Sequence, residues 1–333
     1  MKFSKWQWII PLVIVVFLFA LPTFMHSTRY ISLFNQLYLN IVLAMGVYSV
    51  WTVGYINAAQ PVFYGLGAYT AAILMIKAGW SFWLALPIAG IVPAVIALLF
   101  GFVGLKLKGA YFLFLTIALC DLIIWIFISW KGLFNGQIGF YPIPQPVLHI
   151  FGYKVNFESS LTPYYFLTLI LAIITCLVYF KINGSRLGRV WDSVGKNEDL
   201  LANTGISVFT QKQISLSLSC FFAGLAGAIY APYMKVVSPS GFSLWQGIWI
   251  VLGVLVGGIF SPIGAIIGTV FMSILYLLLQ HYSQAQPLIL GLILVLVLLF
   301  MPTGLVGLPV RIRNKIKDIT GNKAVQTDEK KVI

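Results

Sequence analysis

The stretch SRLGRVWDSVGKNEDLLANTGISVFTQKQ, residues 185–213, is the longest strongly polar stretch in the interior of an otherwise apolar chain. It lies between two hydrophobic runs, near 163–181 and 212–235. An apolar run of roughly 20 residues is long enough to cross the hydrocarbon core of a membrane as a helix. We therefore expect the polar stretch to lie at a membrane surface, where it joins two membrane-spanning helices.

The overall composition places the whole chain in the integral membrane class. Of its 333 residues, 60% are hydrophobic and only 9% are charged, whereas a soluble domain carries about 25% charged residues. The three cysteines, Cys120, Cys176 and Cys220, all lie in apolar runs without CxxC spacing. They are expected to pack as small apolar residues rather than to form disulfides or a zinc site.

The apolar segments predict an all-α integral membrane protein with about ten transmembrane segments, in a range of about eight to ten. The first apolar segment follows lysines, a pattern that signal peptides share. It is long and lacks a clear cleavage site, so an uncleaved helix is favoured. The region 52–79 is rich in glycine and polar residues, and we expect a broken or re-entrant helix there, lining a cavity. The predicted spans are 6–24, 31–51, 61–78, 80–105, 110–130, 163–181, 212–235, 243–260, 262–280 and 285–301.

Lysine and arginine are distributed unevenly between the two sides that ten spans define. With the N-terminus inside, sixteen of the 21 basic residues lie on the inner side and five on the outer side, as in proteins with positively charged cytoplasmic loops. Both termini and the loop 182–211 are then cytoplasmic, and the loop 131–162, with room for a short hairpin, is external. The net charge of +13 thus requires no nucleic acid. We divide the chain into a transmembrane domain, 1–310, and a basic cytoplasmic tail, 311–333, close to lipid headgroups.

The sequence carries no recognisable catalytic or phosphate-binding motif. It has no G-x-x-x-x-G-K-[ST] loop and no HExxH motif, and His26, His149 and His281 lie far apart. These histidines are expected at the membrane interface or in the outer loop rather than at a metal site. We therefore expect a protein that moves a solute across the membrane, that is not an enzyme, and that needs no metal ion or cofactor.

Asp121 is the one carboxylate inside a predicted span, the segment 110–130. A charge in the middle of a bilayer costs about 3 kcal/mol on insertion scales. The side chain is therefore expected to face the interior of the bundle or water, where it could line the translocation pathway near a substrate ammonium. The alternative is a packing carboxylate that hydrogen-bonds a neighbouring helix and is protonated.

Two other regions are predicted to contribute to the translocation pathway. One is the polar region that follows residue 52, and the other is GGIFSPIG, residues 257–264, which cannot continue as a straight helix through Pro262. The alternative for the second region is ordinary packing of helices through small residues. The candidates from both regions are Asn57, Gln60, Tyr64, Gly257 and Gly258.

A short helix is predicted inside the opening polar stretch. Glu198 and Asp199 suit its N-terminus, because carboxylates interact favourably with the helix dipole there. Leu200 and Leu201 give it an apolar face, and Gly205 is suited to end it as a C-cap. Such a helix could dock on a partner, or it could be a solvated connector.

Several motifs resemble the membrane subunits of ABC importers for branched-chain amino acids, and more closely the LivM-like half, which has an additional N-terminal helix. The similarity spans roughly residues 37–308 and includes the polar stretch. In that stretch, the residues that match the family pattern are Leu187, Gly188, Arg189, Glu198, Gly205, Ile206, Lys212 and the segment 223–231. The other matching motifs are GLGAYTAAIL (65–74), LKLKGAYFLFLTIAL (105–119) and VLGVLVGGIFSPIGAIIGT (251–269).

This resemblance implies a set of partners in the plasma membrane of a prokaryote, which is its inner membrane. They are a second, related permease subunit, two cytoplasmic ATP-binding subunits and an external substrate-binding protein, besides the lipid bilayer. The helix at about 194–206 would sit in a groove of an ATP-binding subunit. ATP-driven closure of the ATP-binding pair would move that helix and tilt the spans it joins.

Three departures from the family pattern leave the substrate open. The segment NAAQPVFY (57–64) lacks the family's histidine, NGQIGF (135–140) replaces a glycine-rich element of the outer loop, and Asp121 stands where glutamate is common. Branched-chain amino acids are favoured, with urea, short amides or aromatic compounds as alternatives. A stand-alone secondary transporter is a further alternative, although that class usually carries several ionisable residues inside the membrane.

Overall fold

The computed structural model describes residues 16–22, 27–150, 153–158, 160–259 and 261–279, and short pieces between 288 and 307. The described part is predominantly helical, with one small antiparallel hairpin. The helices and strands are α2 (Thr28–Thr52), α3 (Gln60–Ile76), α4 (Phe82–Gly104), α5 (Ala110–Ser129), α6 (Lys131–Phe134), β1 (Val147–Ile150), β2 (Tyr153–Asn156), α7 (Thr162–Gly184), α8 (Arg186–Lys196), α9 (Glu198–Ala202), α10 (Val208–Met234), η1 (Pro239–Phe242), α11 (Leu244–Gly257), α12 (Pro262–Leu279) and η2 (Leu305–Gly307).

Seven segments of the described chain are long and apolar enough to cross a membrane as helices. They are α2, α4, α5, α7, α10, η1 with α11, and α12, and each coincides with a predicted span to within a few residues. The predicted spans 6–24 and 285–301 and the tail 311–333 lie wholly or mostly outside the described residues. A multi-pass helical bundle is therefore confirmed, and the number of ten spans stays a prediction.

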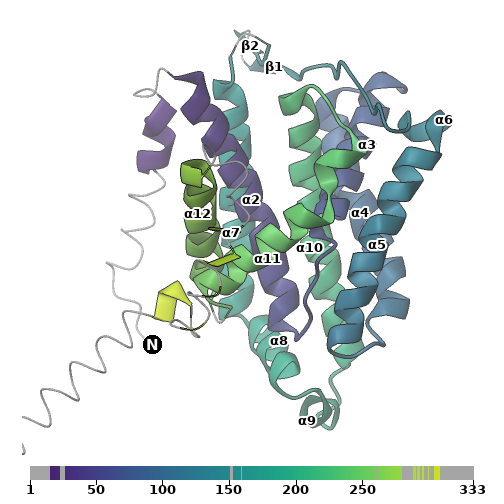
Figure 1. The fold of residues 1–333 in the computed structure, drawn as a ribbon, viewed down its shortest axis with the longest axis vertical. Coiled ribbons are helices and arrows are strands. Elements are labelled where there is room, and N and C mark those ends of the chain that lie inside the picture. Colours follow the sequence, from purple (N-terminus) through teal and green to yellow (C-terminus); the bar gives the residue numbers. More distant parts are fainter. Residues whose placement is uncertain are drawn as a thin grey trace, which may run out of the picture.

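The bundle has two different ends, as Figure 1 shows: the β1–β2 hairpin lies at one end, and α8 and α9 lie at the other. The loop 131–162 does contain a hairpin, with Leu148 opposite Val155. At the same end, Lys77 Nζ donates hydrogen bonds to the carbonyls of Gly132, at 2.6 Å, and Leu133, at 3.0 Å. The two long polar loops of the sequence thus lie at opposite ends, as predicted.

Helix α10 lies in the middle of the bundle, against α2, α3 and α4. Its glycines bring backbones into direct contact: a Cβ on Gly224 would collide with the carbonyl of Ala89 in α4, and one on Gly227 with the carbonyl of Tyr64 in α3. In a membrane the hydrophobic effect does not drive helices together, so association depends on such close packing. The small residues of 223–231 therefore hold α3, α4 and α10 together.

The expected interruption in 52–79 is present between α2 and α3. The chain leaves α2 at the α8 end, and residues 53–59 return toward the interior as an irregular segment before α3 begins (Figure 1). Thr116 Oγ1 accepts a hydrogen bond from the backbone N–H of Ala58, at 3.3 Å, and Asn57 Oδ1 from that of Ala59, at 3.0 Å. Non-helical backbone is tolerated at membrane depth when protein groups satisfy it in this way. Helix α3 has only 17 residues, fewer than a full span normally has.

A second predicted interruption separates α11 from α12. Helix α11 ends at Gly257, Gly258 has φ +116°, and α12 begins at Pro262. A side chain on Gly257 would collide with the backbone of Gly264, and one on Gly268 with the backbone of α11. The two helices therefore form a tight pair whose contact is made of backbone.

The polar stretch contains one helix more than predicted. We expected a single short helix there, but residues 186–196 form the amphipathic helix α8 before it. Ser185 caps α8 by accepting a hydrogen bond from the backbone N–H of Leu187, at 3.2 Å. Helix α8 buries Trp191 and Val194, and the Trp191 indole N–H donates to Gln211 Oε1, at 3.3 Å. Leu187 and Val190 also pack against the core, so the apolar side chains of α8 recur at helical spacing on one face, within a segment whose other side chains are mostly polar.

Candidate functional site

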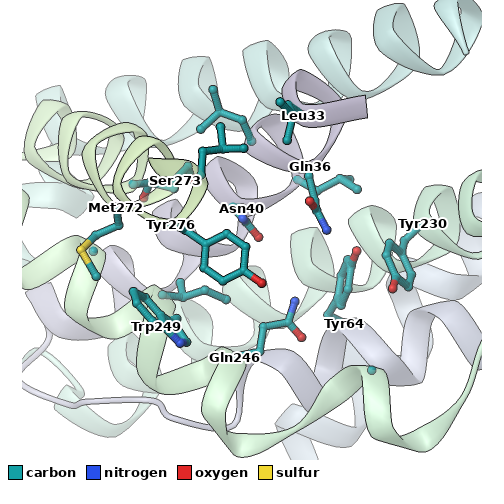
Figure 2. Close-up of a pocket in the computed structure, with 17 residues that line it drawn as sticks. Leu33, Gln36, Asn40, Tyr64, Tyr230, Gln246, Trp249, Met272, Ser273 and Tyr276 are labelled. Atoms are coloured by element: carbon teal, nitrogen blue, oxygen red, sulfur yellow. The ribbon is translucent and has the colours of Figure 1, made fainter. Parts of the chain in front are cut away.

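A cavity of about 400 Å³ lies between the first half of α2, the start of α3, α10, α11 and the second half of α12. Five polar side chains from four helices turn their polar ends toward its centre, as Figure 2 shows. They are Gln36 and Asn40 of α2, Tyr64 of α3, Gln246 of α11 and Tyr276 of α12. The two α2 residues are four positions apart, which places them on one face of that helix.

These five side chains form no hydrogen bonds to other groups in the described part of the chain. The Oε1 atom of Gln246 is buried and has no partner. Aromatic contacts nevertheless hold two of the rings: Tyr64 packs against Tyr230 at a centroid distance of 5.1 Å, and Tyr276 against Trp249 at 6.1 Å. The cavity therefore presents positioned donors and acceptors that are available to a solute.

Apolar side chains complete the wall of the cavity. Leu33 and Leu37 belong to α2, Ile250 to α11, and Met272 to α12. The described residues that line the cavity include no aspartate, glutamate, lysine, arginine or histidine. The site is thus part apolar and part hydrogen-bonding, and its lining is uncharged.

Of the predicted pathway residues, Tyr64 lines this cavity, whereas Asn57 and Gln60 are buried beside it in a separate network. Asn57 Nδ2 donates to Gln60 Oε1, at 3.1 Å, and Gln60 Nε2 donates to the carbonyl of Ser219, at 3.2 Å. The Ser219 hydroxyl also donates to Gln60 Oε1, at 3.1 Å. These bonds attach the start of α3 to α10, so the two amides have a structural role in this conformation.

The other predicted pathway residues also lie outside the cavity. Gly257 and Gly258 form the break and the close contact between α11 and α12, whereas Gly253, one turn earlier in α11, lines the cavity. Asp121 lies on an exposed face of α5. We expected Asp121 to face the interior of the bundle or water, and within this chain it does not face the interior.

At the α8 end of the bundle, α9 is the short helix with an acidic first turn that the sequence predicted, although it is shorter than the expected range 194–206. The Asn197 side chain caps it by accepting from the backbone N–H of Leu200, at 3.1 Å, and Glu198 and Asp199 occupy its first turn. The Leu200 side chain is 66% exposed, whereas Leu201 packs against the hydrophobic core. Gly205 does not cap the helix directly; α9 ends at Ala202, and Gly205, with φ +79°, closes the turn that follows.

Lys212 connects α9 to the bundle. Its Nζ lies 2.6 Å from Glu198 Oε1, and the lysine side chain is only 4% exposed. The same Nζ donates to the Tyr55 hydroxyl, at 3.0 Å, and lies 4.5 Å from the centre of the Tyr55 ring. The Tyr55 hydroxyl in turn donates to the carbonyl of Leu107, at 2.9 Å. One lysine thus joins α9, α10, the α2–α3 segment and the α4–α5 turn.

Several of these residues were not singled out from the sequence. Gln36, Asn40, Gln246 and Tyr276 lie in predicted spans, and the available signal was a pair of uncharged amides at helical spacing within an apolar segment. Tyr55 gave no signal, because its partners are distant in the sequence. In the described residues, no three His, Cys, Asp or Glu side chains gather in a way that could hold a metal ion.

A multi-pass helical bundle that encloses a partly polar cavity and carries a polar helical loop at one end fits the class of membrane transport proteins. Residues 29–302 match the family described as "branched-chain amino acid transport system / permease component". The chain belongs to this family: it is a membrane permease subunit of an ATP-binding-cassette transporter and not an enzyme.

Individual relatives agree with this assignment. The chain is 27% identical to the high-affinity branched-chain amino acid transport system permease protein LivM of Salmonella typhimurium, over 85% of this chain and 71% of the relative. The corresponding LivM of Escherichia coli is 26% identical over the same shares. A nucleoside ABC transporter permease protein, NupC of Lactococcus lactis, is 32% identical over 39% of this chain and 40% of its own length. No solved structure matches the chain.

Proposed function

We propose that this chain forms half of the translocation pathway of a prokaryotic inner-membrane importer for branched-chain amino acids, and that α9 couples it to an ATP-binding subunit. The observation that carries this proposal is that one side of α9 is exposed while another side is bound to the bundle. Leu200 is exposed and available to a partner, while Glu198 on the same helix pairs with buried Lys212. Force applied to α9 therefore reaches the bundle directly.

The network around Lys212 defines the route of that force. A displacement of Glu198 moves Lys212, at the start of the central helix α10, and Tyr55, just before α3. Helices α3, α4 and α10 share backbone contacts, so they respond as a unit. The cavity lies at the edge of this unit, where Tyr64 and Tyr230 face α11 and α12.

The orientation in this proposal follows the positive-inside rule. The basic residues Lys106, Lys181, Arg186, Arg189 and Lys196 belong to the α4–α5 turn, the end of α7 and α8, which lie at the α9 end. That end is proposed to be cytoplasmic, and with it both termini. The hairpin end then faces the exterior, where a substrate-binding protein delivers the solute.

The second permease subunit is proposed to cover the exposed face of α5. Tyr111, Phe114, Asp121 and Trp125 are exposed and recur at helical spacing on one face. An aspartate exposed to lipid at the middle of a span is unfavourable by about 3 kcal/mol on insertion scales. A protein partner with hydrogen-bond donors removes that penalty, and a homologous subunit is the partner that this family supplies.

The substrate assignment rests on the two LivM relatives, which the chain matches over most of its length. The NupC similarity favours nucleosides as a second candidate, although it covers 39% of the chain. Reconstitution distinguishes the two: the complete transporter in vesicles, with its binding protein outside and ATP inside, should accumulate leucine rather than uridine.

The same assay tests the coupling. Glu198→Arg should abolish ATP-dependent uptake while the protein still inserts into the membrane. Asp192→Arg, at an exposed position on α8, is the control and should leave uptake intact. Normal uptake by Glu198→Arg would refute docking through α9. Uptake by this chain alone, without ATP or partners, would favour a secondary transporter instead.

A further inference from the structure

We propose that the cavity between α2, α3, α11 and α12 is a binding site, within this single chain, for a zwitterionic amino acid with an aliphatic side chain. The inference rests on the proposed function, because it names the place where the permease chain holds the transported solute. It is carried by the chemistry of the cavity wall.

The first argument is charge. The described lining residues carry no formal charge, yet they offer both hydrogen-bond donors and acceptors. A solute with a single net charge would lose its hydration there without a counter-charge, which is costly in an apolar interior. An amino acid zwitterion has no net charge, and its two ionic groups need one set of donors and one set of acceptors.

The second argument is the number of unpaired polar groups that converge. The amide N–H groups of Gln36 and the hydroxyls of Tyr64 and Tyr276 can donate to a carboxylate. The buried and unpaired Oε1 of Gln246 and the Asn40 carbonyl oxygen can accept from an ammonium. An unsatisfied buried acceptor costs about 1–3 kcal/mol, so a ligand that satisfies it gains affinity.

The third argument is the apolar part of the wall. Leu33, Leu37, Ile250 and Met272 provide an aliphatic surface beside the polar centre. Met272 can adapt to side chains of different branching, because methionine is unbranched and flexible. The wall therefore matches a solute with one polar end and one branched aliphatic end.

The position of the cavity fits entry from the hairpin end. Gln36 and Asn40 belong to the first half of α2, which begins at that end of the bundle (Figure 1). Under the proposed orientation, this half of α2 is the half nearer the side from which an external binding protein delivers solute. Asp121 is not one of its lining residues, so the site is separate from the exposed face of α5.

The test uses cysteine protection in the complete transporter. Ser273 lines the cavity on α12, whereas its neighbour Ile274 is exposed on the outer face of the same helix. Ser273→Cys should react with a water-soluble methanethiosulfonate reagent, and saturating leucine should slow that reaction at least about tenfold, which corresponds to about 1.4 kcal/mol of protection. Ile274→Cys should show no leucine effect, and the unsubstituted chain controls for the three native cysteines.

The second measurement uses a double variant that carries both Gln246→Leu and Ser273→Cys. The leucine protection should disappear while Ser273→Cys still reacts, because the site remains open but loses its acceptor. Lysine and glutamate, which carry a net charge, should not protect. The inference is overturned if leucine gives no protection, if lysine or glutamate protects equally, if uridine protects in place of leucine, or if Gln246→Leu leaves protection intact.

Uptake measured in the same preparation separates this inference from the proposed function. Leucine uptake without protection of Ser273→Cys refutes the cavity site and leaves the importer assignment standing. Absence of leucine uptake by the unsubstituted transporter refutes the substrate assignment itself, and the cavity inference with it.

Discussion

Lys212 Nζ and Glu198 Oε1 lie 2.6 Å apart, and this contact joins the first residue of α9 to the first turns of α10. The pair is asymmetric, because the lysine is almost completely buried while the glutamate is 30% exposed. A buried charge without its partner is costly, so the pair keeps α9 against the bundle. The contact is therefore suited to transmit motion from a surface helix to the membrane interior.

Lys212→Met should separate coupling from folding. Replacing the buried lysine with an apolar side chain of similar length removes the need for a partner, so stability should change little, whereas the link to α9 is lost. ATP-dependent uptake should fall at least about fivefold, which is the fold-change at the lower end of typical coupling free energies between sites. Lys196→Met is the matched control, because its ion pair with Asp192 is exposed; unchanged uptake in Lys212→Met would contradict the coupling route.

Leu200→Asp should weaken assembly with the ATP-binding subunit without destabilising the permease. The side chain is 66% exposed in this chain, so its replacement changes the free energy of unfolding only slightly. Co-purification of the ATP-binding subunit should drop, and thermal unfolding of the permease should not. Asn203→Asp, at an exposed position after α9, serves as the control, and equal assembly of both variants would argue against a docking role for Leu200.

Asp121→Leu should reduce pairing with the second permease subunit. The substitution removes a polar group from a face that we propose to be covered by that subunit, and it makes the face more favourable to lipid. Cross-linking in membranes should detect less heterodimer, while the isolated chain should unfold at the same or a higher temperature. An unaltered yield of heterodimer, with uptake and KM for leucine unchanged in Asp121→Asn, would exclude both an interface role and a pathway role.

Gly268→Leu should destabilise the α11–α12 pair. A side chain at this position would collide with the backbone of Gly253 and Gly257, so the helices must separate. Overpacking of this kind costs about 1–3 kcal/mol, and a lower thermal midpoint should report it. Gly184→Ala at the end of α7 meets nothing within 4 Å and should be neutral; equal stability of the two variants would mean that the backbone contact is unimportant.

Hydrophobic length was sufficient to place the helices, because a membrane requires about 20 apolar residues for each crossing. The break after Thr52 and the break at Gly258 were also foreseeable, since glycine, proline and polar residues interrupt apolar runs there. Helix α8 was not predicted, although Leu187, Val190, Trp191 and Val194 recur at helical spacing, because the stretch was interpreted from its polar composition and not from this period.

The candidate site was less accessible from sequence. Asp121 is the lone carboxylate in a predicted span, but a charge does not reveal which face of its helix packs inward. In the structure, Asp121 lies on the exposed face of α5. Asn57 accepts a hydrogen bond from the irregular backbone before α3, and Gln60 donates to the carbonyl of Ser219 in α10, so both amides have partners within the chain. The uncharged residues Gln36 and Gln246 line the same cavity only because α2 and α11 pack near each other. A local sequence pattern does not predict this packing.

The bare backbone contacts among α3, α4 and α10 have a mechanical consequence. With no layer of side chains between them to rearrange, these helices cannot slide past one another gradually, and they should behave as one rigid block through the transport cycle. Hinge motion is then expected at the boundary with α12, where the cavity separates that helix from the block. Distances between spin labels should stay fixed inside the block and vary across that boundary. The cavity then opens because its two walls separate, and not because one helix rotates against another.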